Sequence, residues 1–384
     1  FAVVQDYLNG ADENVLKQKI TSVVNDHTKV GQGSIFVAIE GTKIDSHNFI
    51  SEAKAKGTIF TIGSKPTGDP FNEPDLIVEN TRAVLGRVAS LLLGDPSALL
   101  SIYGVTGTNG KTTTTYILKS MFEAMKKEYC VIGTTGIFIN DQKLEASQTT
   151  PDSLVLQKLF AKLLKDKIEN VAMEVSSHSL DQMRVYGTDF LAVGFTNLTQ
   201  DHLDYHENFE NYFEAKAKLF DGYYANTAVI NIDDAHGPKL FDFAKKNEMK
   251  VVSTSIKDKN ANVYVELLSS SLSGCEIEVT ICERTGEVDY QEKIQTSLVG
   301  DFNCENIATA IGLAYFGDID FEYITKALNS NIQIPGRLQR VESTGVTFEV
   351  FVDYSHTPDA LKRAIEVLKP LAKRVIVVFG CGGD

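Results

Sequence analysis

The chain has 384 residues, of which 43% are hydrophobic and 23% are charged, and its formal net charge is −14. This acidic balance argues against a broad surface for nucleic acid or for an anionic membrane, although a local lysine or a helix N-terminus can still bind an anionic ligand. The cysteines form no Cys-x-x-Cys pair and are odd in number, which favours reduced thiols and a cytoplasmic protein. Residues 1–17 contain no apolar segment typical of signal peptides, and no apolar run is long enough to span a bilayer.

The N-terminal region, residues 1–98, is predicted to form a small α/β domain. Three apolar runs, at 34–39, 58–62 and 76–78, are typical of buried strands. Two segments, at 50–56 and 81–93, have helical periodicity. Gly94-Asp95-Pro96 ends the second helix. We therefore place the first domain boundary after residue 98.

A glycine-rich stretch at 104–113 follows an apolar run at 99–103 and leads into a segment with apolar residues at helical spacing. Strand, glycine-rich turn, Lys-Thr and helix are the context in which phosphate-binding loops occur. The glycines let the backbone approach phosphate oxygens, Lys111 can reach the β- and γ-phosphates, and the Thr112 hydroxyl can hold Mg²⁺. Val105 stands where the general pattern has glycine, so a glycine-rich turn without a ligand is the alternative interpretation.

Residues 99–335 are predicted to form a central domain in which strands and helices alternate, as in a largely parallel sheet. The main strands are expected at 130–133, 171–175, 190–195 and 228–231, ahead of a β-rich stretch at 263–281 and a helix at 303–316. In such sheets ligands gather at the carboxyl ends of the strands. The phosphate loop, Glu174 and the segment after Phe195 should therefore converge.

The last region, residues 336–384, is predicted to begin a third α/β domain. Strands are expected at 348–352 and 375–379, with a helix at 359–368 between them. Two parallel strands and one helix cannot bury a hydrophobic core. We therefore expect an incomplete domain, cut at its first glycine-rich loop.

Three positions in the central domain carry side chains suited to catalysis. Glu174, at a strand end beside the phosphate loop, is well placed to hold Mg²⁺, and the alternative is a carboxylate with a structural hydrogen-bonding role. The segment at 201–206, Asp-His-Leu-Asp-Tyr-His, is rich in metal-capable side chains but alone is more typical of a solvated helix N-terminus. It gains weight because it follows the strand expected beside the Glu174 strand. Lys216 lies in an amphipathic helix at 212–220, where an exposed lysine is the simpler interpretation.

A series of short motifs occurs along the chain: Gly-Thr-Asn-Gly-Lys-Thr-Thr at 107–113, Thr-Thr-Pro at 149–151, Glu-Val-Ser-Ser-His at 174–178, Thr-Asn-Leu at 196–198, Asp-His-Leu-Asp-Tyr-His at 201–206, Asn303, Pro-Gly-Arg at 335–337 and Asp-Tyr-Ser-His-Thr-Pro-Asp at 353–359. Together they resemble the Mur ligases, and within them the ligases that add the third residue of the peptidoglycan stem peptide. The resemblance runs from residue 34 to residue 384. The first motif also marks the folylpolyglutamate synthases, and in the Mur ligase form of this motif Val105 is the end of a strand.

The resemblance implies a three-domain Mur ligase architecture: a small N-terminal α/β uridine-binding domain over 1–98, a central P-loop ATPase domain with a mostly parallel sheet over 99–335, and a truncated C-terminal Rossmann-like domain over 336–384. It implies a cytoplasmic, monomeric, ATP-dependent acid–amino-acid ligase. That enzyme would join meso-diaminopimelate or L-lysine to UDP-N-acetylmuramoyl-L-alanyl-D-glutamate through an acyl phosphate. The alternatives are a ligase like the folylpolyglutamate synthases, which the segment at 201–206 and the Thr-Thr-Pro motif disfavour, and a fragment that binds ATP or a UDP-sugar without turnover.

The resemblance also implies roles for individual residues. Thr112 and Glu174 would bind one Mg²⁺, and Glu174, His202 and Lys216 would bind a second. An ammonium group cannot ligate a metal, but the matching lysine of the family reacts with CO₂, which implies N6-carboxylysine at Lys216. The contacts to the muramoyl-peptide would be Thr149, Thr150, Ser176 and Arg184. The catalytic residues would be Lys111, Glu174, His202 and Lys216, and the ATP contacts Gly107, Thr108, Asn109, Gly110, Lys111, Thr112, Thr113, Asn303, Arg337 and His356.

The N-terminal region departs from the family pattern at one point. Asp26-His27-Thr28 stands where the family has Asp-Ser-Arg, and the family serine contacts the uridine nucleotide. His27 cannot simply replace that serine. Either this contact differs in the present chain, or His27 is an ordinary surface histidine.

Overall fold

The computed structural model describes residues 19–41, 44–146, 148–283, 287–341, 347–356 and 358–380. The expectations for residues 1–17 and for Cys381 lie outside these ranges. The cysteines inside them, at 130, 275, 282 and 304, are free, as expected. None of the helices that the structure describes is long and apolar enough to cross a membrane. The chain forms two compact units, which are described separately below.

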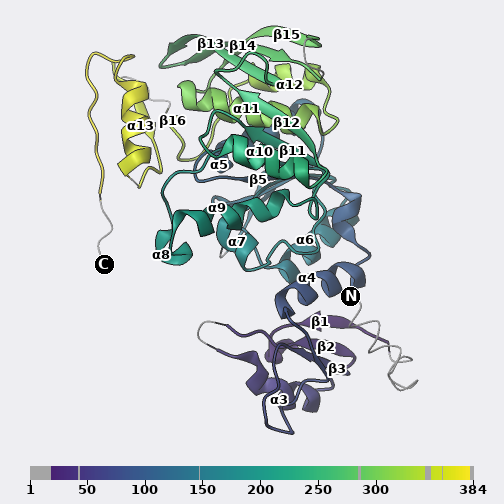
Figure 1. The fold of residues 1–384 in the computed structure, drawn as a ribbon. Helices are drawn as coiled ribbons and strands as arrows, with labels where there is room; N and C mark the ends of the chain where they lie inside the picture. The colour runs from purple at the N-terminus through teal and green to yellow at the C-terminus, as the bar shows by residue number, and fades with distance from the viewer. Residues whose placement is uncertain are drawn as a thin grey trace. The chain divides into compact units, whose positions relative to one another are not determined.

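The first unit contains a small parallel sheet in the order β1-β2-β3-β4 (Figure 1). Its elements are β1 (Ser22–Val24), β2 (Ser34–Val37), α3 (Ile50–Ala55), β3 (Phe60–Gly63), β4 (Leu76–Ile77) and α4 (Thr81–Leu92), with short 3-10 turns at His27–Lys29, Ser46–Phe49 and Pro96–Leu99. The predicted strands and helices of this region are confirmed, with slightly different ends. Two later segments belong to the same unit: α6 (Ser153–Lys165) and residues 181–188.

The second unit is built on an eleven-stranded sheet in the order β15-β14-β13-β12-β11-β10-β5-β9-β6-β7-β8. Its strands are β5 (Ser101–Thr106), β6 (Tyr129–Gly133), β7 (Gly136–Ile139), β8 (Gln142–Leu144), β9 (Asn170–Glu174), β10 (Ala192–Phe195), β11 (Thr227–Asn231), β12 (Lys250–Ser255), β13 (Val263–Ser271), β14 (Gly274–Ile281) and β15 (Tyr290–Thr296). The middle of the sheet, from β13 to β6, is parallel, as predicted. Antiparallel hairpins extend it at both edges, so the whole sheet is mixed.

Helices cover this sheet and bury its apolar side chains. They are α5 (Lys111–Ala124), α7 (Ser177–Asp181), α8 (Leu203–His206), α9 (Phe209–Ala217), α10 (Gly237–Lys246), α11 (Asp301–Tyr315) and α12 (Phe321–Leu328), with a 3-10 turn at Lys218–Phe220. α11 packs against β10 to β13 and against α5, and α12 packs against α5 and β15 (Figure 1). The core between them includes Ile117, Met121, Ile307, Ile311 and Ile324, all at most 1% exposed. This packing fixes α5 and α11, which both begin beside the candidate site.

The C-terminal part is short and differs from the prediction. β16 (Gln339–Val341) and β17 (Val350–Val352) form an antiparallel pair, followed by α13 (Pro358–Leu368). The predicted strand at 375–379 is wrong, because these residues have no regular secondary structure. A strand is stable when a neighbouring strand satisfies its backbone groups, and none of the described strands pairs with this segment. The extents predicted for the three domains remain predictions.

Candidate active site

The loop at 107–110 joins β5 to α5 and needs glycine at two positions. Gly107 and Gly110 have positive φ values of 151° and 87°. A Cβ atom on Gly107 would lie 1.9 Å from Thr196 Oγ1, and one on Gly110 would lie 2.1 Å from Asn306 Oδ1. The backbone is therefore close to its neighbours here, with the N-terminus of α5 directly behind the loop, as in phosphate-binding loops.

The segment after β10 holds the loop from one side. Thr196 Oγ1 donates to the Asn109 carbonyl at 2.6 Å, and the Asn109 N–H donates to Asn197 Oδ1 at 2.9 Å. β10 lies next to β5, and β9, which carries Glu174, lies on the other side of β5. The prediction that the phosphate loop, Glu174 and the segment after Phe195 converge is confirmed. The expectation that β9 and β10 are direct neighbours is wrong, because β5 lies between them.

Two lysines converge on one carbonyl group of the loop. Lys111 Nζ donates to the carbonyls of Gly107 and Thr108 at 2.8 and 2.9 Å, and Lys216 Nζ donates to the same Gly107 carbonyl at 2.9 Å. The interpretation of Lys216 as an exposed lysine is wrong, since it is only 2% exposed. Burial lowers the pKa of Lys111, and burial followed by the charge of Lys111 holds the pKa of Lys216 well below its usual range. Removal from water and a like charge both disfavour the ammonium form.

Glu174 ends β9 with its carboxylate buried and hydrogen-bonded. Its side chain is 1% exposed. Oε1 accepts from Thr112 Oγ1 at 2.9 Å and from the Thr134 N–H at 3.0 Å, and Oε2 accepts from Thr134 Oγ1 at 3.0 Å. Sequence reasoning missed Thr134; the available signal was the Gly-Thr-Thr-Gly turn at 133–136, directly after the strand that pairs with β9.

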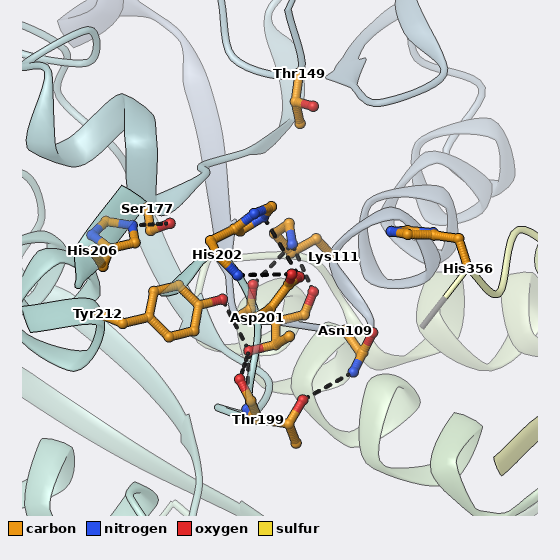
Figure 2. A network of polar contacts seen from close by, with 12 residues as sticks. Asn109, Lys111, Thr149, Ser177, Thr199, Asp201, His202, His206, Tyr212 and His356 are labelled. Carbon is orange, nitrogen blue, oxygen red and sulfur yellow. Dashed lines mark hydrogen bonds and ion pairs between the residues drawn. The ribbon is translucent and has the colours of Figure 1, made fainter. Parts of the chain in front are cut away.

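His202 stands at the start of α8 in an unusual backbone conformation. Its φ is +52°, in the left-handed region that costs a non-glycine residue about 1 kcal/mol or more. Its N–H donates to Asp201 Oδ1 at 2.9 Å, and its Nε2 lies 3.5 Å from Asp201 Oδ2. Burial is the main cause that lowers the pKa of His202. Figure 2 shows Asp201 and His202 beside Lys111.

Tyr212 connects the buried lysine to the loop. Its ring lies 4.6 Å from Lys216 Nζ, and its hydroxyl is 3.1 Å from Thr108 Oγ1 (Figure 2). Burial raises the pKa of Tyr212, so the phenol keeps its proton. Behind it, His206 Nε2 and Ser177 Oγ form a buried hydrogen bond of 2.9 Å. Sequence reasoning did not single out Tyr212, although it precedes Lys216 by one helical turn on α9.

A cavity of about 300 Å³ lies over the loop. Among the predicted site residues, its lining includes Thr108, Asn109, Gly110, Lys111, Thr112, Thr113, Thr149, Glu174, Ser176, His202, Arg337 and His356. Asn303 points elsewhere: its side chain donates to the Val299 carbonyl at 2.8 Å and accepts from Asn306 Nδ2 at 3.2 Å. Asn306, which sequence reasoning missed, lines the cavity beside Gly110.

The residues expected to contact the muramoyl-peptide fall in both units. Thr149 Oγ1 is 3.5 Å from Thr134 Oγ1, and Thr150 Oγ1 donates to the Glu174 carbonyl at 2.9 Å and accepts from the Ser176 N–H at 3.1 Å. These three predicted residues thus gather near Glu174.

Arg184 belongs to the first unit. Its guanidinium donates to Gln182 Oε1 at 3.1 and 2.6 Å, and Nε lies 3.5 Å from Asp152 Oδ1.

The C-terminal part supplies the remaining wall of the cavity. Arg337 Nη2 donates to Thr112 Oγ1 at 3.3 Å, and its guanidinium lies 5.1 Å from the centre of the Tyr354 ring. His356 is exposed, and its Nδ1 is 2.9 Å from the Tyr354 carbonyl. Arg337 and His356, which were predicted to contact ATP, therefore line the cavity. Asn303 on α11, which was also predicted to contact ATP, does not.

His27 lies in the first unit, on the 3-10 turn at His27–Lys29. Its ring stacks on Phe49 with centroids 4.0 Å apart, and its Nε2 is 3.8 Å from Glu52 Oε2. Asp26 caps this turn, and the hydrogen bonds from Thr28 lower the pKa of Asp26 to about 2. His27 is thus partly packed rather than free on the surface.

The described residues contain no cluster of three or more His, Cys, Asp or Glu side chains arranged for a metal ion. A cation at this site would need other donors as well. The Thr112 hydroxyl and the Glu174 carboxylate, 2.9 Å apart and facing the cavity, are oxygen donors of the kind Mg²⁺ prefers.

The chain is similar to known proteins along nearly its whole length. Residues 105–314 match the Mur ligase middle domain, and residues 336–384 match the glutamate ligase domain of the Mur ligases. The UDP-N-acetylmuramoyl-L-alanyl-D-glutamate–2,6-diaminopimelate ligase 1 of Clostridium acetobutylicum is 38% identical over 371 residues, which cover 96% of this chain and 74% of the relative. The corresponding ligase of Fusobacterium nucleatum is 39% identical over 387 residues, covering 98% of this chain and 76% of the relative.

Solved structures show the same relationship. A structure of a UDP-N-acetylmuramoyl-L-alanyl-D-glutamate–2,6-diaminopimelate ligase has a TM-score of 0.81 and 30% identity, covering 96% of this chain and 74% of that one. A folylpolyglutamate synthase of Mycobacterium tuberculosis, complexed with ADP and AMPPCP, has a TM-score of 0.55 and 18% identity, covering 75% and 70% of the two chains. The second likeness extends to the fold alone.

Proposed function

Because the chain belongs to the Mur ligase family, in the branch of the UDP-N-acetylmuramoyl-L-alanyl-D-glutamate–2,6-diaminopimelate ligases, we propose that it adds meso-diaminopimelate to UDP-N-acetylmuramoyl-L-alanyl-D-glutamate with consumption of ATP. The observation that carries the proposal is the 38% identity to such a ligase over 96% of the chain. The reaction forms a C–N amide bond in peptidoglycan synthesis. We place it in the cytoplasm, where UDP-sugars and ATP are available, and we expect a monomer.

The proposed chemistry has two steps. An oxygen of the glutamyl carboxylate attacks the γ-phosphorus of ATP, ADP leaves, and an acyl phosphate forms. An amine of diaminopimelate then attacks the acyl carbon through a tetrahedral intermediate, phosphate leaves and the amine loses a proton. An anion that attacks a triphosphate requires positive charge around the transferred group. Lys111, whose Nζ now rests on loop carbonyls 2.8 and 2.9 Å away, is the side chain placed to supply that charge.

We propose that the site binds two magnesium ions. Thr112 and Glu174 would hold one, and Glu174, His202 and a carboxylated Lys216 would hold the other. The ions would supply charge neutralisation for the triphosphate and the developing negative charge. Supporting this, the pKa of His202 is lowered by burial, which keeps its imidazole in the neutral form that binds metals.

Lys216 fits the modification that the metal site needs. Carbamate formation joins the neutral amine to CO₂, forms an N–C bond and releases one proton. A buried amine with a strongly lowered pKa is available in the neutral form, and Lys216 makes no ion pair with a carboxylate among the described residues. The carbamate would place an anionic oxygen beside Lys111, which would offset the repulsion between the two amines.

The remaining assignments follow the family. Thr149, Thr150, Ser176 and Arg184 contact the muramoyl-peptide; residues 107–113, Arg337 and His356 contact ATP. The family motif assigns an ATP contact to Asn303 as well, although its side chain does not line the cavity. The first unit binds the uridine nucleotide, and the C-terminal part belongs to a Rossmann-like domain. The position of Asn306 on the cavity lining supports giving it a share of the ATP contacts that the family motif assigns to Asn303.

Phosphate release by the purified protein tests the proposal. We expect release that requires ATP, UDP-N-acetylmuramoyl-L-alanyl-D-glutamate and meso-diaminopimelate together, with a mass spectrum showing the corresponding tripeptide product. Reactions with L-lysine in place of diaminopimelate test the choice of amino acid. Release with glutamate and a folate instead would show a folylpolyglutamate synthase activity, and nucleotide binding without any release would show a binding function; either result would contradict the proposal.

A further inference from the structure

The turn that follows β11 is bonded to the segment that follows β10. Asn231 Nδ2 donates to the Thr196 carbonyl at 2.8 Å. Asp234 Oδ2 accepts from the Leu198 N–H at 3.0 Å. The regular pairing of β10 with β11 ends at Phe195, so the two side chains continue the contact beyond the end of the strands. They provide partners for backbone groups that the sheet no longer pairs.

The same segment holds the phosphate loop with its other polar groups. Thr196 Oγ1 and Asn197 Oδ1 bond to the backbone of Asn109, as described above. The Asn197 carbonyl also accepts from the Thr108 N–H at 2.9 Å. Thr196 and Asn197 are buried, with exposed fractions of 2% and 8%. Residues 196–198 therefore bond to the β11 turn on one side and to the loop on the other.

The loop depends on such contacts for its shape. Gly107 and Gly110 lack a Cβ atom, and each can adopt backbone conformations that other residues avoid. A helix N-terminus binds phosphate well when the amide groups around it point at the ligand. A loop that is permissive by itself must therefore be held in that arrangement by its neighbours.

We propose that Asp234 and Asn231 are positioning residues of the phosphate loop. Neither residue lines the cavity, so both act through residues 196–198 and not by touching the nucleotide. The Asn231 amide also donates to Glu305 Oε2 on α11 at 3.2 Å, which ties a second wall of the cavity to the same point. The proposal rests on the proposed use of ATP and adds the residues that keep its phosphate site in shape.

Asp233 provides a matched control from the same turn. Its Oδ1 accepts from Ser255 Oγ at 2.6 Å, and its Oδ2 accepts from the Ile256 N–H at 2.7 Å. These partners lie at the end of β12 and not on the segment that holds the loop. Asp233→Ala therefore removes the same charge and a similar number of hydrogen bonds as Asp234→Ala but leaves the contact with Leu198 in place.

Two measurements on the full chain test the proposal. In the absence of nucleotide, amide hydrogen exchange of Thr108 and Asn109 should be about tenfold faster in Asp234→Ala than in the wild type, the size of one lost hydrogen bond. The dissociation constant for ADP should rise about tenfold in the same variant, as for outer partners of a binding site. This direction is diagnostic, because loss of a negative charge by itself favours an anionic ligand. Asp233→Ala should keep the wild-type loop exchange and should not weaken ADP binding.

Equal loop exchange and equal ADP affinity in Asp234→Ala and Asp233→Ala would show a purely structural role and overturn the proposal. If Asp234→Ala does not fold, Asn231→Asp decides. This variant keeps the acceptor that takes the Asp233 N–H at 3.0 Å but loses the donor to the Thr196 carbonyl. Wild-type exchange of the loop amides in Asn231→Asp would then overturn the proposal. A wild-type protein that does not bind ADP would contradict the proposed function, whereas the exchange measurement would still test the positioning role.

Discussion

The two sides of the cavity are built differently. On the side of the phosphate loop, Lys111 and Glu174 are held by hydrogen bonds of 2.8 to 3.0 Å to the loop and to neighbouring threonines. On the C-terminal side, Tyr354 is 57% exposed, and His356 makes its hydrogen bond to a backbone carbonyl only two residues away. The loop side is held by buried side-chain hydrogen bonds, whereas Asp353, Tyr354 and His356 on the C-terminal side are exposed.

This difference indicates that the two sides of the cavity have different roles in the reaction. Charges that stabilise a transition state are most effective when they are already in place, because no reorganisation is needed during the reaction. Contacts to the ribose and base only need to form upon binding, and lightly packed segments are suited to that. We therefore expect substitutions on the loop side to reduce kcat and substitutions on the C-terminal side to raise KM for ATP.

The largest effect is expected for Lys111→Met. Loss of the positive charge from the loop should reduce kcat for phosphate release by about 1,000-fold, in the range found for preorganised charges. Thermal stability should stay the same or rise, since a buried amine with a lowered pKa is costly to bury. The exposed Lys246→Met is the control and should retain full activity. A kcat for Lys111→Met within tenfold of the wild type would contradict the assignment.

Thr134→Val tests whether the surroundings of Glu174 matter. The substitution removes the hydroxyl that donates to Oε2 at 3.0 Å and leaves the backbone donor to Oε1 in place. We expect kcat to fall about tenfold, as for positioning groups around a metal ligand, with KM for ATP nearly unchanged. Thr135→Val is the matched control, because its hydroxyl is 3.1 Å from Tyr116 Oη instead. Equal kinetics for the two variants would argue against a positioning role for Thr134.

Arg337→Lys tests the C-terminal side. Lysine cannot reproduce both the hydrogen bond to Thr112 and the flat contact with the Tyr354 ring. KM for ATP should rise about fivefold, a cost near that of one exposed hydrogen bond, while kcat changes little. Arg340→Lys is the control, since Arg340 pairs with Glu349 instead. A fall in kcat as large as that of Lys111→Met would remove the distinction between the two sides.

The smallest effect is expected in the pH dependence of stability. Burial raises the pKa of Glu305 above its ordinary value of 4.5. Above pH 4.5 the unfolded chain releases this proton before the folded chain does, so the folded state binds more protons and loses stability as the pH rises through this window. In the Glu305→Gln variant the side chain at this position does not titrate. The free energy of unfolding of this variant relative to the wild type should therefore increase between about pH 4 and pH 7. Urea unfolding at both pH values measures this, and a relative stability that decreases instead would contradict the direction of the shift.

The sequence was sufficient to predict the elements that carry the loop side. Residues 107–110 join a strand to a helix as expected, and Glu174 ends the strand next to the one that leads into this loop. These features follow from local periodicity and from the rule that ligands gather at the carboxyl ends of parallel strands. The motif order was equally informative, since it predicted the family to which the chain belongs.

Other features depend on contacts between residues far apart in the chain. The burial of Lys216 could not be read from an amphipathic pattern, because its cover is provided by the loop at Gly107 and by the ring of Tyr212. The contact between Thr134 and Glu174 depends on the pairing of β6 with β9, which the sequence did not predict. The segment at 375–379 has the composition of a strand but lacks a described partner, and apolar composition alone does not create one.

Transfer of ¹⁸O from substrate to phosphate is the most direct test of the central claim, that the loop side activates a carboxylate as an acyl phosphate. The protein would be incubated with ATP, meso-diaminopimelate and UDP-N-acetylmuramoyl-L-alanyl-D-glutamate labelled with ¹⁸O in the glutamyl side-chain carboxylate. We predict that each phosphate released carries one ¹⁸O atom from that carboxylate. Release of unlabelled phosphate together with the amide product would contradict the account.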